Sequence, residues 1–312
     1  VAGPDRPATR GRPPPSARRT MDGLRRHKSM FLLPGLLTLF LIIIFPLLFT
    51  IRVSFSGWNV SNPQMDFIGG ANYTAMLHDS RFWASITRLI LLAGGTVLIQ
   101  YVIGFGMALL VWREARGRRF WRVLFLVPMM TTPVVMAAIW QTIFHESLGP
   151  ANDLLGMLGL TNIPWLTESG PALVALMTVE VWQWTPFMFL LLLAGLLSLP
   201  KEPFMAAAID GAGTWRTFWK VTFPLMAPVS VAAIVIRLIE ASKLSDSVYV
   251  LTSGGPGSST ETPGYYLYIQ GLRDQQTGYG GAMSLTYLVL MIVTLTVVAA
   301  LLTRAFKLKG DS

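Results

Sequence analysis

Four residues near position 180 combine side-chain types and a spacing that could hold a hydroxyl-rich ligand. The stretch EVWQWTPF places Glu180, Gln183, Trp184 and Phe187 at steps of i, i+3, i+4 and i+7, so they share one face of a helix. A carboxylate and an amide exchange hydrogen bonds with hydroxyls, and a flat aromatic ring stacks on the apolar face of a sugar. Pro186 could open the helix beside them. In the alternative, structural interpretation, the polar pair bonds to a neighbouring helix and the aromatic rings pack.

A second set of charged residues lies about sixty positions further along the chain. Arg237, Glu240, Lys243 and Asp246 follow one another in i, i+3 steps with alternating sign. Such neighbours can pair along one helix, which would make their role structural. The other interpretation is that Glu240 or Lys243 lines a ligand cavity, and the sequence leaves both open.

The sequence offers little for catalysis. The chain has no cysteine, and His27, His78 and His145 lie far apart without ligand spacing, so no metal site is expected. No set of nucleophile, base and orienting group stands out. A G-x-x-x-x-G-K-S/T phosphate loop is absent. The chain itself is therefore not expected to be an enzyme or to hold a cofactor.

The composition indicates that a lipid bilayer surrounds these residues. Of the 312 residues, 53% are hydrophobic and only 13% are charged, whereas soluble domains carry about 25% charged residues. Six apolar stretches are long enough to cross a membrane, or nearly so. We therefore predict an all-α membrane protein with six transmembrane helices, at about 30–51, 86–112, 120–144, 171–199, 224–243 and 283–303.

The candidate ligand-binding residues fall inside two of these predicted spans. The span 171–199 contains the set around Glu180, and the span 224–243 contains Arg237 and Glu240. Polar and charged side chains are costly inside a membrane and are functional candidates by default.

Positive charge gathers in alternate connections between the spans. The chain has a formal net charge of +9. The three connections that alternate with the basic ones hold only three Lys or Arg in total. Because basic segments stay in the cytoplasm, both termini are predicted to be cytoplasmic in a multi-pass protein of the cell membrane, and no nucleic-acid partner is expected. The basic segments hold eight Lys or Arg in 1–28, five in 113–122, three in 200–222 and three in 304–312.

The two ends of the chain differ from its middle. Residues 1–28 are rich in proline and arginine without apolar periodicity, which predicts a disordered basic cytoplasmic tail. The transmembrane domain is then 29–306, and 307–312 form a cytoplasmic C-terminal end. The chain opens on Val1, and Met21 begins a more ordinary basic lead-in and is an alternative start.

The connection 200–223 is too long for a turn and too polar to cross the membrane. Its stretch MAAAIDGAGTWRTFWKVTFP predicts two short amphipathic helices at the membrane surface, with Gly211 at the bend and Asp210 or Thr214 capping the second helix. One interpretation is an interfacial anchor with Trp215 and Trp219 among the lipid headgroups. The other is a docking surface for a cytoplasmic partner.

The spacing in this connection resembles the cytoplasmic loop of permease subunits in binding-protein-dependent ABC importers. The family pattern is Glu-Ala-Ala, three residues, Gly, nine residues, then an aliphatic residue, any residue, Leu and Pro. Two positions depart from it, because Met205 replaces the usual Glu and Phe223 the usual Leu. The matching positions are Met205-Ala206-Ala207, Gly211 and Val221-Thr222-Phe223-Pro224.

Further segments extend the resemblance over nearly the whole chain. LLPGLLTLFLIIIFPLLFTIRVSF, FIGGANYTAML, RRFWRVLFLVPMMTTPVVMAAIWQTIF, GPANDLLGMLGL and LAGLLSLPKEPFMAAAIDGA are similar, in order, to segments of sugar-type permeases. VYVLTSGGPGSSTET is similar to a Leu-Thr-Gly-Gly-Gly-Pro segment of the maltose-type and glycerol-phosphate-type first permeases. The loop after the fifth span that contains it could contact a binding protein or serve as a flexible linker.

This resemblance implies a type I ABC importer permease fold, with a cytoplasmic coupling helix between spans four and five. The implied partners are a second permease subunit, two ATPase subunits that bind ATP and Mg, an extracytoplasmic solute-binding protein, and the lipid bilayer. The implied substrate is a carbohydrate, that is, a sugar, an oligosaccharide or a polyol, and the lack of a basic cluster in the spans favours a neutral one. The residues implied to contact the ATPase are Met205, Ala206, Ala207, Asp210, Gly211, Ala212, Trp215, Phe218 and Pro224.

The main rival interpretation is an autonomous secondary transporter or channel. Such proteins often consist of two related halves, and no clear internal repeat is visible in this sequence. A membrane-embedded enzyme is a weaker rival, because no catalytic set stands out.

Overall fold

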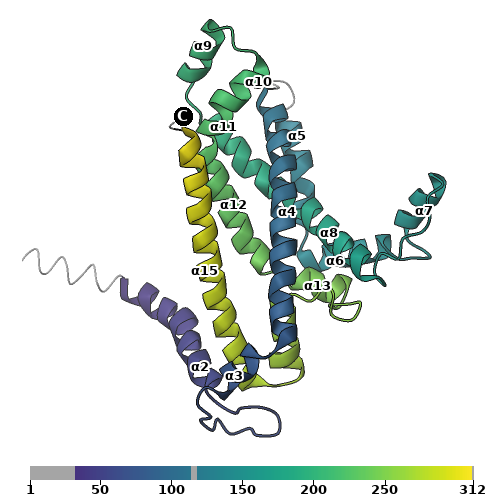
Figure 1. Ribbon diagram of the computed structural model, residues 1–312, viewed down its shortest axis with the longest axis vertical. Helices are drawn as coiled ribbons and strands as arrows, with labels where there is room; N and C mark the ends of the chain where they lie inside the picture. The colour runs from purple at the N-terminus through teal and green to yellow at the C-terminus, as the bar shows by residue number, and fades with distance from the viewer. Residues whose placement is uncertain (1–31, 114–117, 311–312) are drawn as a thin grey trace, which may run out of the picture.

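The computed structural model describes residues 32–113 and 118–310, and these residues are helical almost throughout (Figure 1). They include no strand, only an isolated bridge between Ser56 and Phe67. The prediction of an all-α protein is confirmed. Short π- or 3₁₀-helical stretches are written η, and the elements are η1 (Phe40–Ile44), α2 (Phe45–Ser54), α3 (Ala71–Leu77), α4 (Ser80–Arg113), α5 (Arg118–Leu126), η2 (Val127–Met130), α6 (Pro133–Ile143), α7 (Pro150–Met157), α8 (Ser169–Leu197), α9 (Glu202–Ile209), α10 (Thr214–Thr217), η3 (Phe218–Thr222), α11 (Phe223–Leu225), α12 (Ala227–Ser242), α13 (Asp246–Leu251), α14 (Pro263–Tyr268), η4 (Ile269–Arg273) and α15 (Thr277–Gly310).

Four helices of the described residues are long and apolar enough to cross a membrane. They are Leu32–Ser54, which contains η1 and α2, and the helices α4, α8 and α15. Two further pairs of helices qualify only if each bent pair counts as one span, which gives up to six. The predicted number of six spans is therefore reached only with both bent pairs included.

The stretch predicted as one span at 120–144 is broken in the structure. Val123–Met130 and Pro133–Ile143 form an angle of 93°. Thr131 and Thr132 between them have extended backbone, because the ring of Pro133 disfavours a helical conformation in the residue before it. The proline then begins α6 at its first turn, where a missing N–H costs nothing. A second bend of 63° separates Thr214–Leu225 from α12, the helix of the predicted fifth span.

Pro186 does not open α8. The helix continues without interruption from Ser169 to Leu197 with this proline inside it. A proline removes one backbone hydrogen bond, and nearby hydroxyls can occupy carbonyls in a membrane helix. The carbonyl that loses its backbone donor here is that of Trp182, four residues before Pro186, and the helix continues although the Thr185 hydroxyl donates to a different carbonyl, that of Val181, at 2.6 Å. The sequence-based expectation of an opening at this proline is therefore wrong.

The helices α4 and α8 pack together and form the centre of the bundle with α12 (Figure 1). Gly104 permits the close approach of α4 to α8, because a Cβ there would lie 3.0 Å from the backbone nitrogen of Phe189. Gly195 does the same on the opposite side of α8, where a Cβ would meet Val229 of α12. Large buried side chains fill the remaining space between these helices, among them Leu92, Val97, Leu176, Phe189, Leu192 and Met226.

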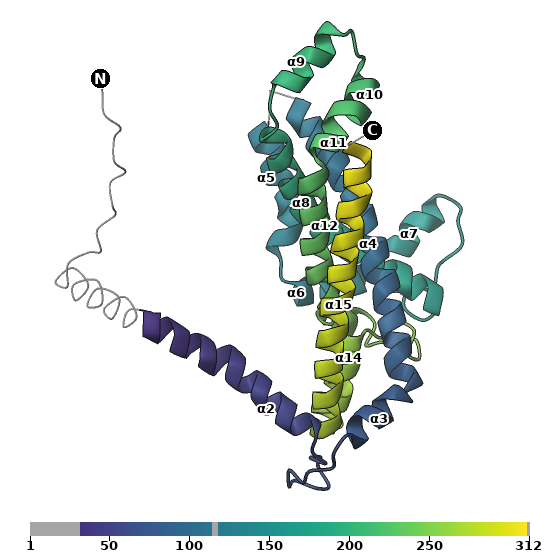
Figure 2. The ribbon, with the colours of Figure 1, turned by 60° about the vertical axis from the view of Figure 1, so that its left-hand side comes forward.

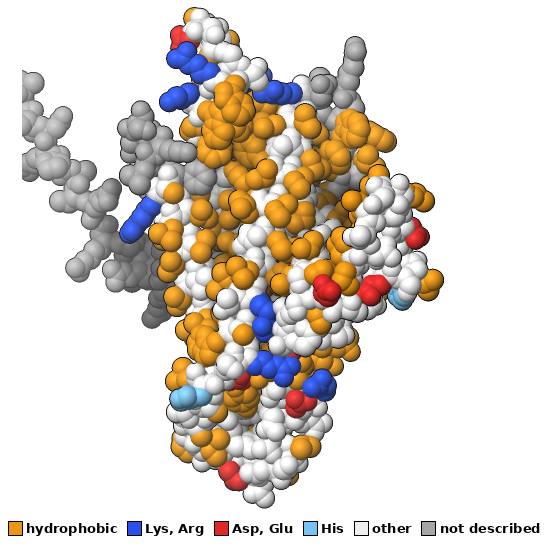
Figure 3. Space-filling model, turned by 45° about the vertical axis from the view of Figure 1, so that its right-hand side comes forward, with side chains coloured by type: hydrophobic (Ala, Val, Ile, Leu, Met, Phe, Trp, Pro, Cys, Tyr) orange, Lys and Arg blue, Asp and Glu red, His pale blue; other side chains and the backbone are white. Residues whose placement is uncertain are grey.

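The outermost helices bury little within this chain. The most apolar windows of Leu32–Ser54 and of the last helix have no buried residue. The first of these helices leaves the bundle altogether and approaches it only near its C-terminal end (Figure 2). Hydrophobic side chains dominate the long side of the molecule, and Lys and Arg side chains form one group at the end that carries α9 and α10 and another nearer the opposite end (Figure 3). Such a surface is suited to lipid or to other membrane helices.

The connection after α8 forms one end of the molecule. Helices α9 and α10 lie there beside the C-terminal ends of α4 and α15 (Figure 1). The predicted basic connections 113–122 and 200–222 and the C-terminal segment therefore share one end of the bundle. The predicted tail 1–28 lies outside the described residues.

Candidate functional site

A buried ion pair connects two of the central helices. Nη2 of Arg237 in α12 lies 2.9 Å from Oε2 of Glu180 in α8. The two side chains are 1% and 5% exposed. An unpaired charge at this depth would be strongly destabilising, so each residue depends on the other.

Two more side chains complete this group, which we call the polar hub: Gln100, Glu180, Arg237 and Ser247. Nε of Arg237 donates to Oε1 of Gln100 at 2.8 Å. Nε2 of Gln100 donates to the Glu180 backbone carbonyl at 2.9 Å. The Ser247 hydroxyl donates to Oε1 of Glu180 at 3.0 Å. The polar hub therefore joins α4, α8, α12 and α13 at one buried point.

A cavity of about 290 Å³ lies directly beside the polar hub. We call it the polar cavity. The Arg237 guanidinium carbon stacks over the Trp184 ring at 4.9 Å from its centroid, which fixes one face of that ring. The cavity is lined by Pro133, Glu180, Trp184, Arg237, Glu240, Lys243, Leu244, Ser245, Asp246 and Ser247.

The structure brings together four of the six residues predicted to lie on a substrate path. Glu180 and Trp184 from α8 and Glu240 and Lys243 from the end of α12 line the same cavity. They meet although about sixty positions separate the two pairs in sequence, because α8 and α12 pack side by side.

The other two predicted residues face different surroundings. Gln183 is buried, and its Nε2 donates to the Thr131 carbonyl at 2.9 Å, where it supports the break before α6. Its Oε1 is buried without a hydrogen-bond partner among the described residues. Phe187 is half-buried and packs edge-on against Trp184 with ring centroids 6.4 Å apart. Neither side chain lines the polar cavity.

Charge pairing in the second predicted set follows the helix only in part. Nζ of Lys243 lies 2.7 Å from Oε2 of Glu240, the i, i+3 pair that the spacing indicates. Arg237 pairs instead with Glu180 on another helix. The structural and the cavity-lining interpretations are both met by Glu240 and Lys243, since they pair with each other and line the cavity.

Sequence reasoning missed several members of the site. Gln100 and Ser247 were not singled out, although Gln100 lies inside the predicted span 86–112, where a polar side chain is a functional candidate. Asp246 was noted only as a helical neighbour, and it lines the cavity from the start of α13.

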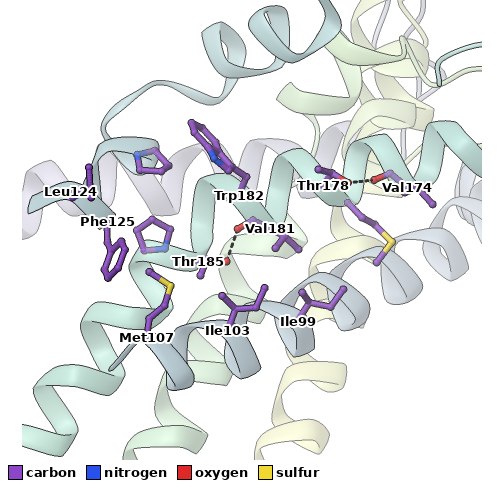
Figure 4. A pocket seen from close by; sticks show the side chains of 13 residues that line it. Ile99, Ile103, Met107, Leu124, Phe125, Val174, Thr178, Val181, Trp182 and Thr185 are labelled. Atoms are coloured by element: carbon purple, nitrogen blue, oxygen red, sulfur yellow. Dashed lines mark hydrogen bonds between the residues drawn. The ribbon is translucent and has the colours of Figure 1, made fainter. Parts of the chain in front are cut away.

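A larger cavity of about 700 Å³ lies on the other side of α8 but has almost no free polar group (Figure 4). Its lining is aliphatic and aromatic, with side chains such as Ile103, Phe125 and Trp182. The hydroxyls of Thr178 and Thr185 donate to carbonyls of their own helix, as the dashed lines in Figure 4 show. A hydroxyl-rich ligand would find no partner there, so the smaller polar cavity is the candidate site.

The exposed connection after α8 is shaped by Gly211. This residue has φ +65°, a conformation that L side chains rarely adopt. Two backbone bonds close the end of α9: Gly211 N–H donates to the Ala208 carbonyl at 3.1 Å, and Ala212 N–H to the Ala207 carbonyl at 2.9 Å. This is a Schellman turn, in which glycine is the usual residue. Gly211 therefore makes the bend as its position in the sequence indicates.

The predicted cap of the second short helix is wrong. Gly213 occupies the N-cap of α10, and no side chain caps the helix. Asp210 instead ends α9, and Thr214 is already the first residue of α10. The tight turn at Gly211 leaves both side chains out of capping position.

The residues that resemble a coupling loop divide into an exposed and a supporting group. Met205 and Trp215 are 58% and 73% exposed, and Ala206, Asp210 and Gly211 are also exposed. Ala207 is buried, and Ala212, Phe218 and Pro224 are half-buried.

Aromatic rings anchor this connection to the bundle. Phe218 packs edge-on against Phe105 of α4 with centroids 5.8 Å apart. Trp215, Trp219 and Phe223 surround Phe218 at centroid distances of 5.0 to 6.3 Å. The exposed rings therefore rest on a packed aromatic base that extends to a central helix.

The loop after α13 is held inside the protein. Thr260, Glu261 and Thr262 are at most 1% exposed. Arg81 of α4 pairs with Glu261 at 2.5 Å, and Nε of Arg88 donates to the Glu261 carbonyl at 2.9 Å. These contacts do not fit a flexible linker.

A carboxylate just before α4 is held by two tyrosines near this loop. The Asp79 carboxylate accepts hydrogen bonds from the hydroxyls of Tyr279 at 2.6 Å and Tyr266 at 2.8 Å. Burial acts to raise the pKa of Asp79, but these bonds, together with the backbone N–H groups of Phe82 and Arg81, hold it below its ordinary value. Among the described residues, no group of three or more His, Asp or Glu could hold a metal ion; His27 lies outside them.

Residues 100–307 match the family model described as the binding-protein-dependent transport system inner membrane component. The chain belongs to this family. The resemblance found in the sequence motifs is therefore confirmed for this permease. The trehalose/maltose transport system permease protein MalF of Thermococcus litoralis is 33% identical over 264 residues, which cover 84% of this chain and 89% of that protein. The sulfoquinovosyl glycerol transport system permease protein SmoG of Agrobacterium fabrum is 34% identical over 274 residues, or 87% and 89% of the two chains.

A solved structure shows that this permease has the fold of the importer family. A chain of a bacterial ABC transporter involved in import of the acidic polysaccharide alginate aligns with a TM-score of 0.79, at 20% identity. The alignment covers 92% of this chain and 99% of that chain. The permease thus has the type I ABC importer permease fold.

Proposed function

We propose that this permease is one of two permease subunits of an ATP-driven importer and forms half of the translocation path for a carbohydrate. A sugar, oligosaccharide or polyol would be delivered by an extracytoplasmic binding protein. Family membership supports the importer, and the relatives named for trehalose and maltose transport support the carbohydrate. A second permease and two ATPase subunits would complete the complex within the lipid bilayer.

The single observation that carries the substrate class is the polar cavity. It combines the Trp184 ring, fixed on one face by Arg237, with the polar groups of half-buried Glu240 and of exposed Lys243 and Asp246. Sugars present both an apolar ring face and several hydroxyls, so a ring beside charged hydrogen-bonding groups suits them. The volume of about 290 Å³ would fit a small sugar or part of an oligosaccharide.

The α9–α10 connection is proposed to be the coupling helix, which docks on an ATPase subunit. Its side chains Met205, Ile209 and Trp215 are exposed, the helices α9 and α10 that carry them lie at one end of the bundle (Figure 1), and tryptophan is a frequent anchor of interfaces. The aromatic base under it would transmit movement of the ATPase to α4 and α12. The coupling loop is assigned to 200–223.

The topology that follows from this docking is also a proposal. If α9 and α10 meet a cytoplasmic ATPase, the C-terminal end at 307–312 lies in the cytoplasm, and with six spans the tail 1–28 does too. The permease domain is assigned to 29–306 in the cell membrane. ATP and Mg would be bound by the partner subunits, so this chain would need no cofactor and perform no catalysis.

Co-purification followed by an ATPase assay tests the proposal. We expect the tagged chain, extracted from its native membrane, to carry a second permease and an ATPase subunit. Addition of the cognate binding protein loaded with sugar should stimulate ATP hydrolysis. If the chain purified alone and transported sugar in liposomes without an ATPase, it would instead be an autonomous transporter or channel.

A further inference from the structure

The charges that line the polar cavity do not cancel. Five charged side chains line it, three acidic and two basic: Glu180, Glu240, Asp246, Arg237 and Lys243. If each has its ordinary charge, their sum is −1.

Both cations of the cavity are already paired. Arg237 donates to Glu180 and to Gln100, and it stacks on Trp184. The Lys243 ammonium lies 2.7 Å from Glu240. A ligand carboxylate or sulfonate would therefore have to compete with a carboxylate of the protein for either cation.

Asp246 is the acidic residue left over. It forms no ion pair with any Lys or Arg of the described residues. Within 32–113 and 118–310, its carboxylate takes part in one side-chain hydrogen bond, a long one of 3.4 Å from the Ser245 hydroxyl, and it is exposed. Its two carboxylate oxygens are thus available, and a carboxylate can accept two parallel hydrogen bonds, as from adjacent hydroxyls of a sugar.

The fold does not decide the charge of the transported molecule. The alginate importer, which has the same fold, acts on an acidic polysaccharide. Within this chain, selection between acidic and neutral sugars would therefore depend on individual side chains along the path, in addition to any selection by the binding protein. The polar cavity is where this chain shows a charge imbalance beside an aromatic ring.

We propose that Asp246 is a specificity-determining residue, which accepts hydrogen bonds from a neutral sugar and excludes acidic sugars by charge repulsion. This inference rests on the proposed function, because it names the substrate class for the same cavity. It also predicts a negative potential at the neighbouring Ser245.

The absence of cysteine from the chain allows a direct measurement of that potential. In the complete importer, Ser245→Cys is labelled by a cationic and by an anionic methanethiosulfonate of similar size, at low salt. Labelling is followed by the increase in the intact mass of this chain. The labelling rate with each reagent is divided by the rate at which the same reagent labels a free thiol in solution. We expect a cation preference of roughly ten-fold, since one charge at this distance acts oppositely on the two reagents.

Three companion variants and one control variant separate the effect of charge from an effect on the fold. Asp246→Asn should bring the ratio of the normalised cationic rate to the normalised anionic rate close to one, and Asp246→Glu should keep this ratio high. Lys243→Gln should raise it further, because Glu240 then loses its counter-charge. Asp274→Asn, an acid paired with Arg273 outside the cavity, serves as the control and should leave the ratio unchanged. A ratio near one in the parent, or one that ignores Asp246→Asn, would overturn the proposal.

Protection by sugars then tests the substrate class. Maltose and its acid maltobionate are added at equal concentration before labelling of Ser245→Cys with a neutral maleimide. We expect maltose to protect and maltobionate to do so only in the Asp246→Asn background. Equal protection by both in the parent would contradict the role of Asp246. If neither protects while the charge preference holds, the polar cavity does not bind maltose-type sugars, the specificity role of Asp246 fails for them, and only the electrostatic assignment stands.

Discussion

The polar hub and the α9–α10 connection belong to one bundle, and opposite kinds of interaction hold them in place. The hub is almost closed to solvent and depends on charges and hydrogen bonds that meet from four helices. The connection is largely exposed, and a left-handed glycine and packed aromatic rings shape it. The first arrangement fails when one partner is removed. The second should tolerate most single changes except those that alter its backbone.

The largest effect is expected from breaking the buried ion pair. Glu180→Gln or Arg237→Met alone leaves an unpaired buried charge, which costs about 3–5 kcal/mol. We expect the purified importer to lose most of its thermal stability, measured by unfolding of the complex in detergent. The matched control is Glu240→Gln, because the Glu240–Lys243 pair is substantially exposed and such pairs contribute about 1 kcal/mol or less.

The double variant Glu180→Gln with Arg237→Met, which combines the two single changes, sharpens this test. Removing both charges should recover a large part of the lost stability, since the penalty comes from the partner left unpaired. If the double variant were as unstable as the sum of the two single variants, the ion pair would not be the reason for their effects.

The next largest effect concerns coupling rather than stability. Gly211→Val places a β-branched side chain at φ +65°, which costs roughly 1–2 kcal/mol of strain. We expect the turn to rearrange and the sugar transported per ATP hydrolysed to fall about ten-fold, with thermal stability little changed. Gly213→Ala is the control, because Gly213 has φ −67° and an added Cβ meets nothing within 4 Å. Normal uptake and normal stimulated hydrolysis in Gly211→Val would contradict the docking role.

The third prediction concerns the Trp184 ring, which lines the polar cavity. Trp184→Ala removes the stacking ring, worth about 1 kcal/mol, and should raise the KM for sugar uptake about five-fold while the ATP cost per sugar stays the same. Trp184→Phe should restore part of the affinity. Phe187→Leu, next to the ring but outside the cavity lining, should leave KM unchanged. An unchanged KM in Trp184→Ala would remove this ring from the substrate path.

The smallest effect concerns Asp79. Its pKa in the folded protein lies below the ordinary value of 3.8. A carboxyl group whose pKa is lowered by folding stabilises the protein at pH values above its ordinary pKa. This stabilisation is lost as the pH falls through the pKa of the group in the folded protein. We expect the parent importer to lose stability below about pH 4 and the Asp79→Asn variant to show a flatter dependence in thermal unfolding between pH 3 and 6. Identical slopes for the two proteins would contradict the assignment.

The same contrast explains what could be predicted from the sequence. The bend at Gly211 could be predicted because the requirement for a glycine is local: it depends on a few neighbouring residues and their backbone angles. The long apolar helices could be predicted because length and apolarity are properties of a single segment of the sequence. Of the four residues spaced around Glu180, the structure places Glu180 and Trp184 at the polar cavity and Gln183 and Phe187 outside its lining.

The polar hub could not be predicted, because its partners are far apart in the chain. Gln100 and Arg237 are 80 and 57 positions from Glu180, and only the packing of three helices brings them together. The local i, i+3 rule favoured pairing of Arg237 with Glu240, and the long-range partner prevailed. The break before Pro133 was missed because prolines are tolerated inside membrane helices, as Pro186 in α8 shows.

The most direct test measures uptake of sugar by the complete importer in liposomes. ATP is either supplied in the compartment that faces the ATPase subunits or left out. The loaded binding protein is supplied on the opposite side, and labelled sugar is counted inside over time. We expect sugar to accumulate against its gradient only with ATP, and the sugar accumulated per ATP hydrolysed to fall about ten-fold in Gly211→Val. Accumulation of sugar without ATP, or by this chain in the absence of the ATPase, would contradict the claim that it is a permease driven through the α9–α10 connection.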